Sequence, residues 1–169
     1  MNAALRLSWY KFKHHYMDFV KVLLGIVAFE GLILYIQDKG FLKDFETTRM
    51  TLFLLLFSTS LLIVVQNSIY ISKERSVLNR DFFSGLSRSA FALASMGIHA
   101  FFAVLETIVF ILSYSVFSKF FDKEFPDAGH IFGSYRWEVG ITVLLVFLAS
   151  HFIALFISAL VGKSEITSV

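Results

Sequence analysis

The sequence contains no cysteine and a single proline, Pro126, and its formal net charge is only +2. The absence of cysteine excludes disulfide bonds, thiolate metal sites and a cysteine nucleophile. One proline cannot make a proline-rich linker. A net charge this small does not favour nucleic acid as a partner, because proteins that bind nucleic acid carry a clear excess of positive charge. The character of the chain is therefore set by its apolar residues.

Apolar residues make up 57% of the 169 residues, including 21 phenylalanines, and the mean hydropathy is +0.72. A water-soluble domain of this size cannot hide so much apolar surface in one core, so we expect the surrounding solvent to be lipid. The sequence predicts an all-α polytopic membrane protein that forms one transmembrane domain over residues 1–169. The runs long enough to cross a bilayer as helices lie at about 19–36, 50–71, 90–117 and 139–161.

Residues 1–18 precede the first span and mix basic side chains with tryptophan, tyrosine and leucine. Aromatic rings favour the membrane interface, and basic side chains meet the anionic heads of lipids. This composition predicts an amphipathic helix that lies in the headgroup layer. The alternative is an ordinary basic flank that fixes the topology of the first span.

The polar segment 72–89 lies between the second and third spans, and it is net basic. Lysine and arginine accumulate in short loops that face the cytosol. The loops 37–49 and 118–138 have no basic excess, which fits the external side. The pattern predicts that both termini are cytosolic and that the chain is an integral protein of the plasma (inner) membrane.

Four ionisable residues fall inside the predicted spans, where charge is costly and function is the first hypothesis. They are Glu30, His99, Glu106 and His151. His99 and Glu106 are seven residues apart, so they share one face of a helix. We expect a polar seam between the first, third and fourth spans. One alternative is that the side chains of this seam form interhelical hydrogen bonds that only hold the bundle together. The other is that they form a substrate path or a coupling relay.

The chain carries no recognisable catalytic motif. The triplet Gly162-Lys163-Ser164 resembles the end of a phosphate-binding loop, but Ile157 stands where that loop requires glycine, and no strand precedes it. A zinc-type His-Glu-x-x-His pair is also missing, and without ligand spacing we assign no metal site to the seam. We expect no catalytic residue and no cofactor in this chain.

The polar segment 72–89 also contains two charged pairs followed by a glycine. Glu74 and Arg75 are followed by Arg80 and Asp81, and then by Gly85 before the third span. This order resembles the cytosolic loop of the membrane domain in G-type ABC transporters, within the type 2 ABC exporter permeases. In that family the second pair is Arg-Glu. The resemblance extends over essentially the whole chain.

Two features depart from this family. Its members usually have six spans, and this chain has four, which predicts a fragment or a subunit completed by another chain. The family commonly has proline in the third span, near the position of Ala103.

The resemblance implies that the loop contains a coupling helix, which rests in a groove of an ABC ATPase and passes on its movement. Phe82 and Phe83 would then fill an apolar notch of the ATPase. Charged contacts would fix the register, and they would come from Glu74, Arg75, Arg80 and Asp81. ATP and Mg would be held by this partner domain or subunit.

The resemblance further implies an exporter that forms a homodimer or heterodimer of membrane domains and carries a hydrophobic or amphipathic substrate between them. The alternative is a four-helix membrane scaffold or assembly subunit that transports nothing. A third hypothesis is a membrane-embedded enzyme that uses the histidine and glutamate seam.

Overall fold

The computed structural model describes residues 2–37, 45–68, 75–121, 131 and 133–160, with no side-chain description for residues 2–15, 45, 75–77 and 81. Within these ranges the chain is helical and contains no strand. Four long helices and one short helix follow in the order α1 (Asn2–Ile36), α2 (Phe45–Asn67), α4 (Arg75–Phe83), α5 (Arg88–Phe120) and α6 (Tyr135–Leu160). The all-α prediction is confirmed.

The four long helices are each apolar and long enough to cross a membrane. Their candidate spans are Tyr16–Ile36, Glu46–Asn67, Arg88–Phe120 and Tyr135–Leu160. Each overlaps one of the predicted runs and begins two to four residues earlier, and the expected ends at Ile71 and Val161 lie outside the described residues. The third span is the longest at 33 residues, about 50 Å of helix, which exceeds the thickness of the hydrocarbon core.

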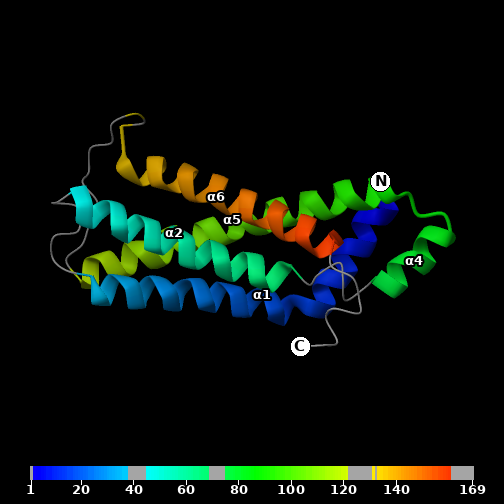
Figure 1. The fold of residues 1–169 in the computed structure, drawn as a ribbon, viewed down its shortest axis with the longest axis horizontal. Helices are drawn as coiled ribbons and strands as arrows, with labels where there is room; N and C mark the ends of the chain where they lie inside the picture. The colour runs from blue at the N-terminus through cyan, green and yellow to red at the C-terminus, as the bar shows by residue number, and fades with distance from the viewer. Residues whose placement is uncertain (1, 38–44, 69–74, 122–130, 132, 161–169) are drawn as a thin grey trace.

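The predicted interfacial segment 1–18 and the first span form one continuous helix, α1. Figure 1 shows that the N-terminal part of α1 runs obliquely to the rest of the helix. Because α1 has no proline or loop between the two parts, the segment is an extension of the span rather than a separate element. The basic side chains before Tyr16 that suggested headgroup contact lie outside the described side chains.

The long helices pack as a ring in which each contacts two neighbours. α1 packs on α2 and α5, and α6 packs on the same two helices. Consecutive spans α2 and α5 therefore stand at opposite corners of the bundle, as do α1 and α6. Leucine, isoleucine and phenylalanine fill the centre, where the rings of Phe110 and Phe147 meet edge to face at 5.8 Å between centroids.

Large apolar side chains also cover the outside of the bundle. One example from each long helix is given by Leu24, Phe53, Leu112 and Leu145. A surface of this kind is stable only in lipid or against a partner. The chain is thus an integral membrane protein. Figure 1 places the start of α1, the whole of α4 and the end of α6 at the same end of the bundle.

Candidate functional site

Three of the predicted intramembrane residues meet between α5 and α6. His99 and Glu106 lie two turns apart on α5, and both face His151 of α6. Nδ1 of His99 is 3.0 Å from Nδ1 of His151, and Nε2 of His151 is 2.8 Å from Oε2 of Glu106. All three side chains are buried. We refer to these three residues as the polar triad.

The contacts of the polar triad form one chain of hydrogen bonds. With an ionised Glu106, one ring hydrogen on each imidazole accounts for both contacts: Nε2 of His151 donates to Glu106, and Nδ1 of His99 donates to Nδ1 of His151. Oε1 of Glu106 is buried and has no hydrogen-bond partner in the described part of the chain. The triad therefore links α5 to α6 and keeps one unused acceptor inside the bundle.

Glu30 lies apart from the polar triad, in a second polar contact. Its side chain is fully buried on α1, and Oε2 accepts a hydrogen bond from the hydroxyl of Ser113 on α5. Ser113 comes seven residues after Glu106, about 10 Å further along the helix. The structure thus divides the expected seam into two contacts, and α5 contributes to both because it is the neighbour of both α1 and α6.

Ser113 is a polar residue that the sequence reasoning missed. The signal was available, because His99, Glu106 and Ser113 repeat every seven residues and so follow one stripe of α5. Most other hydroxyls in the spans bond to carbonyls of their own helix, as Thr107 does to Ala103. Across the described residues, no group of three histidine, cysteine, aspartate or glutamate side chains is arranged to hold a metal ion.

The expected coupling segment forms the short helix α4 at one end of the bundle. Gly85 follows α4 with φ +103°, a conformation that favours glycine, and its N–H bonds to the carbonyl of Phe82. Ser87 then caps α5 by accepting a hydrogen bond from the N–H of Ala90. The glycine of the sequence pattern is therefore the residue that turns the chain from α4 into α5.

The two phenylalanines of α4 face different surroundings. The ring of Phe82 meets Phe91 of α5 at 5.9 Å and lies under the guanidinium of Arg88 at 5.6 Å. Phe83 is 93% exposed and points away from the bundle. Adjacent helical residues lie on different faces, and in this structure only the ring of Phe83 is fully exposed. Phe82 joins α4 to α5, and Phe83 stays exposed.

The charged residues expected to set the register are only partly described. Arg80 is exposed on α4. Glu74 lies outside the described residues, as do the side chains of Arg75 and Asp81.

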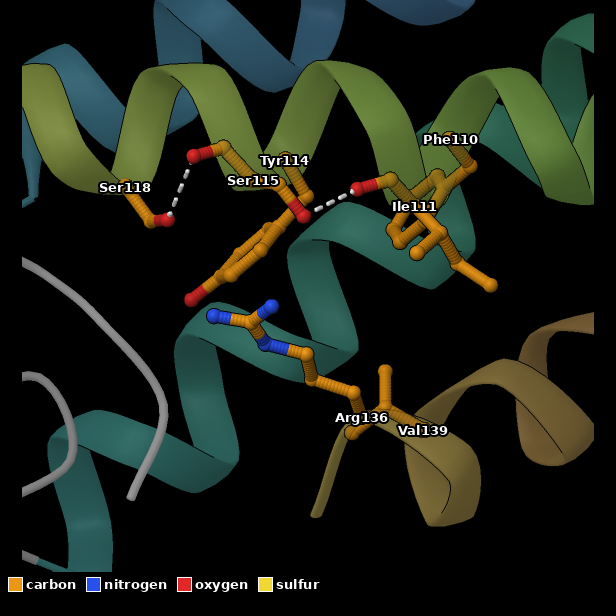
Figure 2. A pocket seen from close by; sticks show the side chains of 7 residues that line it. All are labelled: Phe110, Ile111, Tyr114, Ser115, Ser118, Arg136 and Val139. Atoms are coloured by element: carbon orange, nitrogen blue, oxygen red, sulfur yellow. Dashed lines mark hydrogen bonds between the residues drawn. The ribbon is translucent and has the colours of Figure 1, made fainter. Parts of the chain in front are cut away.

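A small cavity with polar and apolar lining residues lies at the opposite end of the bundle, between the end of α5 and the start of α6. Its volume is about 20 Å³, room for about one water molecule. Figure 2 shows the guanidinium of Arg136 and the hydroxyl of Tyr114 pointing toward one another in this cavity, with Ser118 beside them. Sequence reasoning placed Arg136 only in an external loop. Its approach to Tyr114 follows from the packing of α5 on α6.

Comparison with protein families gives one match across nearly the whole chain. The family model described as ABC-2 type transporter matches residues 6–169. Comparison with curated proteins and with solved structures gives no significant match.

Proposed function

Because this chain belongs to the ABC-2 type transporter family and is the membrane-spanning permease part of an ABC transporter, we propose that it couples ATP hydrolysis on a partner ATPase to substrate export. Members of this family normally work with an ABC ATPase, and the permease is not itself the ATPase. In the proposed complex, ATP and Mg bind to the partner. The substrate is hydrophobic or amphipathic and crosses between two such membrane domains.

The exposed ring of Phe83 is the observation that carries the coupling proposal. A phenylalanine that is 93% exposed at the end of the bundle costs free energy in water and fits an apolar pocket on a partner. Arg80, exposed on the same short helix, offers a charged contact beside it. α4 thus offers a partner the apolar ring of Phe83 and, next to it, the positive charge of Arg80.

The contacts of Phe82 support a route by which force would pass from α4 into the bundle. Phe82 touches α5, so a push on α4 displaces the start of the third span. α5 is tied to α6 by the polar triad and to α1 by the contact of Glu30 with Ser113. We propose that α5 moves together with these two neighbours, as a packed unit.

The orientation of the proposed permease follows from its charge pattern. The basic segment 72–89 favours the cytosolic side of the plasma (inner) membrane. The start of α1 and the end of α6 lie at the same end of the bundle as α4, which supports cytosolic termini (Figure 1).

The test compares two exposed phenylalanines at opposite ends of the bundle. Phe83→Ala is expected to reduce the amount of ATPase that co-purifies with the chain in mild detergent at least fivefold. Phe120→Ala removes a ring that is 80% exposed at the other end and is expected to leave the complex intact. Undiminished ATPase recovery with Phe83→Ala would refute the docking role of α4.

A second variant separates docking from force transfer. Phe82→Ala removes the contact with α5 but keeps Phe83 exposed. We expect normal ATPase binding and a loss of transport for each ATP hydrolysed. If transport per ATP is unchanged, force does not pass through Phe82. If the chain were a non-transporting scaffold subunit, it would bind its partner, and neither the unaltered chain nor any variant would transport a substrate.

A further inference from the structure

A large cavity lies where α4 meets the start of α5 and the end of α6. Its volume is about 730 Å³, which falls in the range of small-molecule sites. Its wall is formed largely by apolar side chains, including Phe91 of α5 and Leu155 and Phe156 of α6. Phe156 is also well exposed on the outside of the bundle, so the cavity opens toward the apolar surface that faces lipid.

A cationic side chain lines the cavity. Among the described residues of its wall, Arg88 is the only charged one, and it stands at the first position of α5. Its guanidinium is held over the ring of Phe82, which fixes the charge between α4 and α5. The N-terminus of α5 adds a positive end of a helix dipole at the same place. The part of the cavity beside Arg88 is therefore suited to an anion.

A buried polar group of α5 also lines this cavity. Ser95 lines the cavity two turns after Arg88, about 10 Å further along α5, and the residue is buried. Its hydroxyl has no hydrogen-bond partner in the described part of the chain. Serines in the membrane normally bond to a carbonyl of their own helix, as Ser115 does to Ile111. The unused hydroxyl of Ser95 is a donor for an oxygen atom that enters the cavity.

We propose that this cavity binds one anionic glycerophospholipid from the adjacent leaflet. The phosphate contacts the guanidinium of Arg88, an ester oxygen accepts the hydroxyl of Ser95, and an acyl chain lies against Phe91 and Phe156. The order of these groups along the cavity is a cation, then a hydrogen-bond donor, with apolar side chains throughout, and it matches the order of phosphate, ester and acyl chain in such a lipid. The bound lipid fills the space between α4 and the ends of two spans.

This inference goes beyond the proposed transport function and does not depend on it. Lipid binding requires only the cavity and the bilayer, so it is measured without ATP. If Phe83 does not dock on the ATPase, the lipid proposal is unaffected. If the cavity binds no lipid, the docking proposal is unaffected.

The experiment uses the full chain reconstituted in bilayer discs of phosphatidylcholine and phosphatidylglycerol in equal amounts. After extraction in mild detergent, the lipids that remain bound are identified and counted by mass spectrometry. We expect about one phosphatidylglycerol for each chain and at least fivefold less phosphatidylcholine. Equal retention of both lipids would overturn the proposal.

Three variants test the two halves of the site, two at Arg88 and one at Ala92. Arg88→Gln should abolish the preference for phosphatidylglycerol, and Arg88→Lys should keep part of it. Ala92→Trp, which places a large ring in the cavity wall, should reduce retention of both lipids at least fivefold. The matched control is Arg136→Gln at the other end of the bundle, which should bind lipid as the unaltered chain does.

Each variant is checked for folding by its elution as a single species and by its helical circular dichroism. If Arg88→Gln fails this check, Arg88→Lys and Ala92→Trp still decide the outcome. Unchanged phosphatidylglycerol retention in folded Ala92→Trp would show that lipid binds elsewhere. Crosslinking of a second copy or of the ATPase into the cavity in place of lipid would also overturn the proposal.

Discussion

His151 of α6 and Glu106 of α5 form a hydrogen bond of 2.8 Å, and each side chain is only 1% exposed. Because the pair lies in the membrane-spanning part of the bundle, neither group can replace its partner with water. We predict a coupling free energy of about 0.6–1.7 kcal/mol between Glu106→Ala and His151→Ala in a double-mutant cycle. The measurement is reversible unfolding in detergent and denaturant.

The neighbouring residues in sequence supply the control cycle. Thr107 and Ser150 bond to carbonyls of their own helices, Ala103 and Val146. Thr107→Val and Ser150→Ala should therefore be additive to within about 0.5 kcal/mol. Additive behaviour at Glu106 and His151 would contradict the hydrogen bond. If Glu106→Gln keeps stability but loses transport, the polar triad acts as a relay rather than only as a support.

Ser113 supplies the hydrogen bond that the buried carboxylate of Glu30 accepts. Ser113→Ala leaves that oxygen without its donor, and we predict a loss of about 1–3 kcal/mol in the free energy of unfolding. Ser115→Ala is the matched control, because the hydroxyl of Ser115 donates to the carbonyl of Ile111 in its own helix, and the change should cost about 0.5 kcal/mol or less. Equal effects in the two variants would show that Glu30 does not depend on Ser113.

Gly31 allows α1 to approach α5 closely. A methyl group at this position would lie 3.1 Å from Cζ of the Phe117 ring, which is tighter than an ordinary contact. We predict that Gly31→Ala destabilises the bundle by about 1–3 kcal/mol. Gly97→Ala meets nothing within 4 Å and should instead stabilise α5 by about 0.5–1 kcal/mol. Thermal unfolding of both variants decides whether crowding or helix propensity governs Gly31.

The absence of cysteine makes the membrane orientation directly measurable. Single cysteines at Ser84, after α4, and at Ile131, before α6, occupy opposite ends of the bundle. A membrane-impermeant maleimide added to intact cells should label Ile131→Cys at once. Ser84→Cys should react only after the membrane is made permeable. The reverse pattern would place α4 outside and would exclude contact with a cytosolic ATPase.

The contacts of α4 show which details of the candidate site could be predicted from the sequence and which could not. Phe82 and Phe83 are adjacent, and helical geometry requires them to point about 100° apart. Reasoning from sequence nevertheless assigned both rings to one partner pocket. The structure turns Phe82 toward Phe91 and leaves Phe83 exposed, because the turn at Gly85 sets which face of α4 meets α5.

The amino-acid sequence by itself determined the class of the protein, the four spans and the shared face of His99 and Glu106. These follow from properties of a single helix in lipid, namely its length, hydropathy and periodicity. Only the tertiary structure decided that Glu30 pairs with Ser113 and that His151 joins His99 and Glu106. Such pairings depend on the order of helices around the bundle, and that order arises from side-chain packing between segments far apart in the chain.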